Sequence, residues 1–385
     1  MRKNITLIKK KLDKNSEIIL IFLLFIFFIT ESISKISIYT GQQKSDFQAI
    51  IKALVLLFVS TGLLFQKKKE FYYLLILTLS FSIGQYYILD SFEQSSLAYF
   101  TKYIFAIALF GFFSVDFSRP KIKLLHIFEY LLVINSVLIL IGFLFEISFL
   151  QSYLGNRFGY NGLLITTATG TYFHIIGLCY FLMRYKKNIL KKWKFWLLVI
   201  ASLLIGTKSI ILALAAIGLF YIFTYLKSKR VKFSLFALAV LGAVGFGYYL
   251  FYLNPLFLEI KESQGFLTSF LSLRDLLFTE STLPYIQEYW KTINYLFGGV
   301  SNFELRPQME FIDLLFFWGI FGGLIYSCFY VKSFISFKLD KTFIFSIILL
   351  FSIALLAGNF FYNASLPIYL LILRESFCIN QQKSV

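Results

Sequence analysis

The chain has 385 residues, of which 58% are hydrophobic and 15% are charged, and its formal net charge is +17. A soluble domain is about half apolar and about one quarter charged, so this composition excludes a soluble enzyme, a disordered protein and a fibrous protein. The 49 Phe and 25 Tyr fit a lipid-facing surface, where aromatic side chains are enriched. The composition predicts an all-α integral membrane protein that forms a single domain over residues 1–385.

Twelve apolar runs are long enough, or nearly long enough, to cross a bilayer, which takes about 20 residues as a helix. The runs are continuously apolar rather than alternating, which favours helices over a barrel. The first run follows a basic start, and we expect it to be an uncleaved first helix. The runs are 17–38, 47–65, 71–89, 97–115, 122–147, 162–183, 193–206, 209–226, 233–253, 311–331, 341–358 and 361–377.

The basic residues predict the orientation of these helices. On this topology 27 of the 37 Lys and Arg lie on one side of the membrane, counting four at the adjoining ends of spans; seven lie on the other side, and the remaining three lie within spans. Because cytoplasmic segments collect Lys and Arg, the excess predicts that both termini are cytoplasmic. The same interpretation accounts for the net charge without a nucleic-acid partner. The many Lys, Ile, Phe, Tyr and Asn residues are typical of an AT-rich bacterial genome, so we expect the protein in the cytoplasmic membrane of a bacterium.

One long extracellular loop is predicted at residues 254–310, whereas most other loops on that side are short. Loops of this length are usually functional or disordered, and this one carries apolar residues at helical spacing. Residues 281–297 predict an amphipathic helix with Pro284 in its first turn and Gly298 after its end. Residues 268–278 predict a second short helix. The helices could guide a substrate or simply cover the bundle.

Three cations on the predicted outer side are candidates for binding an anion. Arg157 lies in the glycine-rich stretch LGNRFGYNG, whose amides and guanidinium could surround a phosphate. Lys208 lies at the tip of a tight hairpin in IGTKS, where it could bind an anion or reach the interface as a snorkelling side chain. Arg274 lies among leucines and needs an anionic partner or a water-filled cavity; Asp275 is one possible partner.

Residues 304–322 close the long loop and carry further candidates. Glu310 and Asp313 are three residues apart, so both carboxylates lie on one face at the outer start of a span, close to Arg306. They could compensate a helix dipole or act in proton transfer, with Glu310 as a base for a sugar hydroxyl. His174 lies in the middle of a predicted span, where an ionisable side chain is a site candidate or a helix-packing partner.

These motifs occur in an order that resembles the O-antigen ligase and polymerase superfamily, and specifically the Wzy-type polymerases of capsular or O-antigen repeat units. The resemblance covers about residues 154–330 and is carried by NRFGYNG, GTKS followed by IILALAAIG, LRD, YLFGGV and EFIDLLFFWGIFGGLIY. It implies a GT-C-like helical fold and a metal-independent, inverting glycosyltransferase that needs no cofactor. The implied donor and acceptor are undecaprenyl-diphosphate-linked oligosaccharides on the outer leaflet.

Carried over from the family, Arg157 and Arg274 match loop arginines that grip the lipid diphosphate, and Lys208 matches a basic residue after a Ser/Thr-Gly stretch. Arg306, Asp313 and His174 are further substrate-binding candidates. The related ligases have a His where this sequence has Gln308, Met309 and Glu310, which argues against a ligase. The resemblance also implies membrane lipid, a flippase and a chain-length regulator as partners.

Two other functions are compatible with a helical membrane protein. A flippase or another multi-span transporter predicts two similar halves with helices broken at the midplane, and no such similarity is visible in the sequence. A ligase that transfers finished glycan to another acceptor is poorly separated from a polymerase by sequence.

Overall fold

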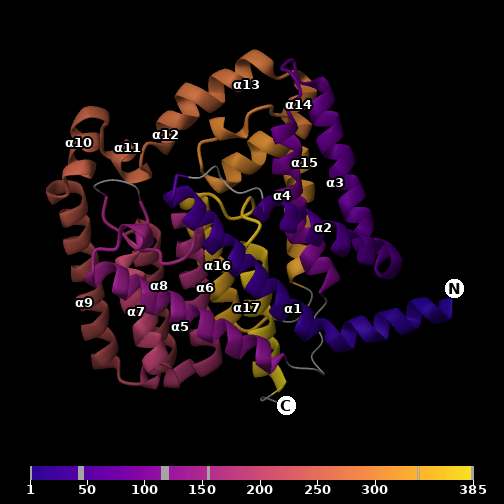
Figure 1. The fold of residues 1–385 in the computed structure, drawn as a ribbon. Coiled ribbons are helices and arrows are strands. Elements are labelled where there is room, and N and C mark those ends of the chain that lie inside the picture. The colour runs from indigo at the N-terminus through magenta and orange to yellow at the C-terminus, as the bar shows by residue number, and fades with distance from the viewer. Residues whose placement is uncertain are drawn as a thin grey trace.

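The computed structural model describes residues 2–41, 47–113, 121–153, 157–335, 337 and 339–382. Over these residues the secondary structure is helical, apart from one isolated antiparallel bridge between Gln151 and Tyr160. The predicted all-α class is therefore confirmed for the described chain, whose helices form one bundle with a layer of short helices across one end (Figure 1).

Each of the twelve predicted apolar runs overlaps one helix, and the shortest of these, α7, has 12 residues. These helices are α1 Arg2–Tyr39, α2 Phe47–Gln66, α3 Lys68–Tyr87, α4 Gln94–Phe112, α5 Ile122–Leu144, α6 Thr167–Tyr185, α7 Trp193–Leu204, α8 Lys208–Tyr225, α9 Lys229–Tyr248, α15 Glu310–Phe334, α16 Lys341–Ala357 and α17 Leu366–Gln382.

Seven helices of the described chain are long and apolar enough to cross a membrane, judged by length and composition. The helices α7 and α16 are apolar but shorter, and the predicted spans in α3, α6 and α17 do not meet the same criterion. A polytopic helical membrane protein is therefore supported, and twelve crossings stay a prediction. The seven segments are Asn15–Tyr39, Ala49–Gln66, Gln94–Phe112, Ile122–Leu144, Lys208–Tyr225, Lys229–Leu253 and Glu310–Phe334.

The long loop predicted at 254–310 is folded into short helices that arch over one end of the bundle (Figure 1). We call this end the loop end. The short helices are α10 Pro255–Gln264, α11 Phe266–Leu271, α12 Arg274–Leu277, α13 Leu283–Tyr289 and α14 Thr292–Phe297. The loop also contains the short turns η4 Phe278–Thr282 and η5 Phe303–Leu305. Other short 3-10 or π turns are η1 Ser148–Leu150, η2 Lys186–Lys191 and η3 Tyr249–Leu253.

The prediction of a single helix over residues 281–297 is wrong in one respect: the helix is interrupted at Trp290, which separates α13 from α14. Trp290 is extended, and its indole N–H donates to the carbonyl of Gly299 at 2.9 Å. The side chain of Asn294 then accepts the backbone N–H of Lys291 at 3.0 Å, which starts a new helix. The predicted first-turn position of Pro284 and the end at Gly298 are both confirmed.

The helix predicted at 268–278 is also interrupted. Ser272 and Leu273 both adopt left-handed backbone conformations, with φ of 57° and 68°, and separate α11 from α12. Non-glycine residues rarely occupy this region, so the surrounding structure must hold them there. The break places Arg274 at the start of α12 instead of within a continuous helix.

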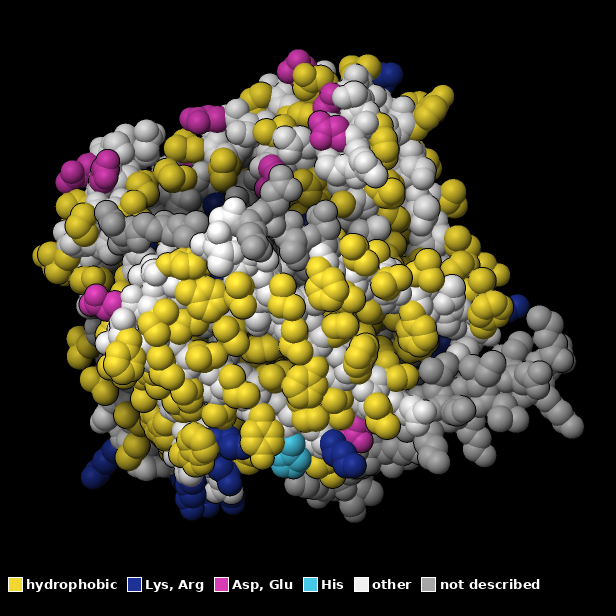
Figure 2. Space-filling view, viewed as in Figure 1, with side chains coloured by type: hydrophobic (Ala, Val, Ile, Leu, Met, Phe, Trp, Pro, Cys, Tyr) yellow, Lys and Arg dark blue, Asp and Glu magenta, His cyan; other side chains and the backbone are white. Residues whose placement is uncertain are grey.

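Charge is distributed unevenly along the bundle axis. Figure 2 shows apolar side chains over the middle of the visible face, Asp and Glu at the loop end, and most of the visible Lys and Arg at the opposite end. We call the opposite end the basic end. For the basic side chains that the structure describes, the pattern agrees with the asymmetry counted in the sequence; the side chains of residues 2–14 and of Lys44, Arg119, Lys338 and Lys383 are not among them.

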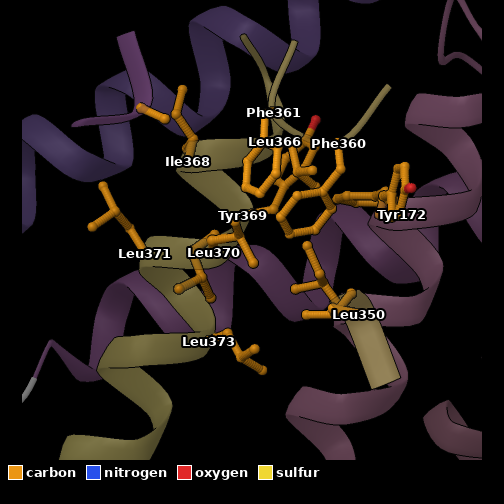
Figure 3. Packing of buried hydrophobic residues seen from close by; sticks show 14 of the residues in the cluster. Tyr172, Leu350, Phe360, Phe361, Leu366, Ile368, Tyr369, Leu370, Leu371 and Leu373 are labelled. Atoms are coloured by element: carbon orange, nitrogen blue, oxygen red, sulfur yellow. The ribbon is translucent and has the colours of Figure 1, made fainter. Parts of the chain in front are cut away.

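The centre of the bundle is built on α6 and α17. Every side chain from Thr169 to Met183 of α6 is buried, and α17 is α6's most extensive helical neighbour. The ring of Tyr369 in α17 packs on Phe173 in α6 at 4.8 Å between centroids. Figure 3 shows the leucines of α17 continuing this contact toward Phe360 and Phe361, which precede the helix. These two helices are thereby screened from lipid on most sides.

Close backbone contact joins the loop end to α15. Within α15, Gly319 departs from helical geometry with φ of 66°, and a Cβ there would lie 2.5 Å from the backbone nitrogen of Gly298. A Cβ on Gly298, whose φ is 72°, would lie 2.2 Å from the carbonyl oxygen of Phe317. Both positions require glycine because of conformation and because of space.

We predict that Gly319→Ala lowers the free energy of unfolding by about 1–3 kcal/mol, since it adds strain and a steric clash at once. Denaturation of the purified chain in detergent, followed by circular dichroism, measures the change. Gly242→Ala is the matched control, because nothing lies within 4 Å of a Cβ there and alanine favours the helix. Equal stability of Gly319→Ala and the original chain would contradict this account.

Candidate functional site

Two of the motifs singled out in the sequence lie against each other at the loop end. The backbone N–H of Tyr160 donates to the carbonyl of Leu204 at 2.7 Å, which ties the loop of Arg157 to the α7–α8 turn. A Cβ on Gly206 would lie 2.3 Å from the carbonyl oxygen of Phe158. This close approach, at a φ of 76°, explains the glycine in IGTKS. Residues 154–156 of the other motif lie outside the described residues.

Lys208 links the start of α8 to the helices of the long loop. Its ammonium donates to the carbonyl of Ser269 at 2.8 Å and to the hydroxyl of Ser272 at 3.2 Å. The same nitrogen lies 3.9 Å from the centre of the Phe257 ring. Lys208 is therefore not a side chain that merely extends to the interface, because it is held by neutral groups of α10 and α11.

Arg274 is bound to the end of α16. Its guanidinium donates to the carbonyls of Leu356 at 2.5 Å and Ala357 at 3.3 Å, which are at the negative end of that helix dipole. The suggested partner Asp275 instead accepts a hydrogen bond from Thr268 at 2.6 Å. Burial lowers the pKa of Arg274 from its usual value, and repulsion from Arg157 acts in the same direction.

Arg157, Lys208 and Arg274 form one group of positive charges, which we call the cation cluster. The charges of Arg157 and Arg274 act on each other, and both act on Lys208. Arg157 itself is exposed and stacks on the ring of Tyr153 at 4.0 Å. Among the described residues, none of the three forms an ion pair with a carboxylate. A concentration of unpaired cations favours the binding of an anion.

The first turns of two long helices lie beside the cluster. The hydroxyl of Thr207, which precedes α8, is 3.1 Å from the hydroxyl of Thr171 near the start of α6. Thr207 is the N-cap residue of α8, but its side chain makes no hydrogen bond to the α8 amides. The positive end of the α8 dipole then adds to the field of the cations.

Arg306, Glu310 and Asp313 form a second group, which we call the buried cluster. Arg306 pairs with Asp313 at 3.3 Å and donates to the side chain of Asn359 at 2.9 Å. Burial disfavours the charged form of Arg306, but the carboxylate of Asp313 holds its pKa above the usual value. The exposed fractions are 5% for Arg306, 0% for Glu310 and 1% for Asp313, so the cluster is closed to a large substrate in this conformation.

Glu310 is engaged by backbone on both carboxylate oxygens. It accepts the N–H groups of Phe360 at 2.6 Å and Phe361 at 2.7 Å. With no exposed surface, it lacks access to the sugar hydroxyl that a catalytic base would meet. The two hydrogen bonds instead show that Glu310 holds the backbone of the segment that follows α16 in place.

His174 lies apart from both clusters in its contacts. It is fully buried in α6, and its Nδ1 atom is 2.9 Å from the carbonyl of Gly170 one turn earlier. This is the local bond of a helix-packing side chain, and no described contact joins His174 to the cation cluster or the buried cluster.

The segment between α16 and α17, residues 358–365, was not predicted to be part of the site; we call it the α16–α17 connection. The carbonyl of Gly358 accepts the Tyr172 hydroxyl at 2.9 Å, and the following residues bind Arg306 and Glu310 as described above. Arg274 binds the two residues immediately before it. The connection therefore joins the two clusters. The turn-rich stretch GNFFYNASLP was the available signal.

No family model matches the chain, and no match to it was found among curated proteins or solved structures.

We predict that Arg306→Ala lowers the free energy of unfolding by about 3–5 kcal/mol, because it leaves the buried Asp313 without its partner. Chemical denaturation in detergent measures the loss. The double variant Arg306→Met with Asp313→Leu should recover much of it, since neither charge then remains in the interior. A double variant as unstable as Arg306→Ala would show that the ion pair is not the reason.

Proposed function

We propose that this chain is a glycosyltransferase of the bacterial cytoplasmic membrane that polymerises undecaprenyl-diphosphate-linked oligosaccharide units into a capsular or O-antigen polysaccharide. The observation that carries the proposal is the cation cluster, in which three positive side chains act on one another and, among the described residues, none forms an ion pair with a carboxylate; Asp313 acts on Arg274 only from beyond ion-pair distance. A diphosphate is an anion with enough oxygen atoms to accept hydrogen bonds from all three side chains. The motif order of a Wzy-type polymerase supports the same assignment.

Orientation supports an outer-leaflet reaction. The cation cluster lies at the loop end, whereas the visible Lys and Arg gather mainly at the basic end (Figure 2). Under the positive-inside rule the basic end faces the cytoplasm, so both termini are cytoplasmic and the cluster faces outward. A substrate already linked to a lipid on that leaflet needs no nucleotide, which suits a chain without a nucleotide-binding motif.

The chemistry follows from these positions. A hydroxyl of the acceptor unit attacks the anomeric carbon of the donor glycan, and the bond from that carbon to the phosphate oxygen breaks with inversion. Both electrons of that bond leave with the lipid diphosphate, which also takes up the hydroxyl proton. Cations at its oxygens stabilise the charge as it develops, and Arg157 and Arg274 suit this better than lysines because guanidinium binds two oxygens at once.

The two clusters have different parts in this proposal. The cation cluster binds the leaving group, and the buried cluster fixes the α16–α17 connection. Since Arg274 rests on the carbonyls of residues 356 and 357, its position depends on that connection. Arg306, Glu310 and Asp313 then act as positioning residues rather than as groups that touch the substrate.

We predict that Arg157→Ala reduces polymer formation by on the order of a hundredfold or more, the usual effect of removing one donor to a developing oxyanion. Arg157 is exposed, so the variant should insert and fold normally. Lipid-linked single repeats should accumulate on the outer leaflet, which electrophoresis of the glycan and extraction of the lipid-linked units would show.

The control is Lys261→Ala, which removes a cation of the long loop 254–310 whose ammonium lies over the ring of Tyr252 at 3.5 Å. Its polymer should have normal length. Unchanged chain length in Arg157→Ala would reject the proposal. Repeats that remain on the cytoplasmic leaflet would point to a flippase instead.

A further inference from the structure

An apolar surface borders the cation cluster on the side of α10 and α11. Phe266 is 57% exposed and Phe270 is 45% exposed on α11, although Phe251 and Phe257 beneath them are buried. Exposed apolar area of this kind marks a place where another apolar molecule rests. We call this surface the phenylalanine patch; it consists of Leu253, Leu256, Phe266, Leu267 and Phe270.

The patch is continuous with the cluster through Lys208. The ammonium of Lys208 donates to the carbonyl of Phe270 at 3.2 Å and lies 5.3 Å from the centre of the Phe251 ring. The Phe251 ring in turn packs against Phe266 at 5.0 Å between centroids. One short stretch of chain thus places positive charge and exposed aromatic surface side by side.

We propose that the phenylalanine patch binds the first isoprene units of the donor lipid, next to the diphosphate that the cation cluster holds. This inference rests on the proposed function. In a prenyl diphosphate the anionic diphosphate is bonded directly to a branched hydrocarbon. In the protein, Lys208 of the cation cluster lies directly beside the aromatic rings of the patch, so the anion and the hydrocarbon could each meet a matching surface. Close contact between the isoprene units and the exposed rings adds to the affinity that the cations provide.

Leu253 is the last residue of the candidate membrane span Lys229–Leu253, and the other patch residues lie beyond that span on α10 and α11. The patch follows the end of α9, at the loop end, on helices whose other side chains include Glu259 and Glu262. An amphipathic helix that only rests at the interface would expose apolar residues too, but nothing in that role requires them to adjoin Lys208. If the patch binds the lipid tail, the affinity for a diphosphate depends on the hydrocarbon attached to it. If the patch only anchors the helices at the interface, that affinity does not depend on the hydrocarbon.

The test is a binding measurement on the full chain purified in detergent, with farnesyl diphosphate and inorganic diphosphate as separate probes. The variant Phe266→Ser with Phe270→Ser should bind farnesyl diphosphate on the order of tenfold more weakly, equal to about 1.4 kcal/mol, and bind inorganic diphosphate as before. Phe233→Ser, at a 74% exposed position near the start of α9, is the matched control and should bind both probes normally.

The outcomes separate this inference from the function it rests on. If the original chain binds inorganic diphosphate but gains nothing from the farnesyl group, the patch assignment is overturned and the cation cluster stands. Parallel weakening of both probes in the double variant also overturns the patch assignment. If the original chain binds neither probe, the proposed function itself fails.

Discussion

Arg157, Lys208 and Arg274 repel one another, none of them forms an ion pair with a carboxylate of the described residues, and the fold has to offset that repulsion. It does so with neutral groups: the carbonyls at the end of α16 hold Arg274, carbonyls of α11 hold Lys208, and the ring of Tyr153 supports Arg157. Dipoles and rings stabilise a positive charge without neutralising it. The cluster consequently keeps its attraction for an anion, which an ion pair with a local acid would have removed.

This arrangement depends on structure far away in the sequence. The carbonyls that receive Arg274 are in place because the α16–α17 connection is bound at several points, including the two amides that Glu310 accepts. Glu310 and Arg306 lie at the end of the long loop, so one stretch of chain supplies the anchors and another supplies the cations. The side chains of the buried cluster are closed to solvent, whereas in the cation cluster Arg157 is exposed and Lys208 and Arg274 are half-buried. Such a division suits a site that has to be fixed before its ligand arrives.

The sequence was sufficient for the class of protein and for much of its order. Apolar runs are set by the length of a helix in lipid, and a helix overlaps each predicted run. The cations were found because charges are rare here and stood out in turn-rich segments. Their lack of acidic partners was not predictable, because Asp275 follows Arg274 directly and only the fold shows that it turns to Thr268.

Other features escaped prediction for the same reason. Glu310 looked available as a base in the sequence, but its backbone partners lie about 50 residues further along, and only tertiary packing brings them to it. The break at Trp290 depends on a hydrogen bond to Gly299 that competes with helix continuation. Helical spacing reports the faces of helices well. The spacing of residues in the sequence gives no information about a side chain that hydrogen-bonds to backbone far away in the sequence, as Glu310 does.

The most direct measurement is an experimental structure of the full chain with a polyprenyl diphosphate bound in a lipid nanodisc. We expect both phosphates to lie within hydrogen-bonding distance of Arg157, Lys208 and Arg274, with the hydrocarbon leaving the site over α11. Density for the diphosphate at another position, or a carboxylate of the chain itself occupying the cluster in its place, would contradict the account.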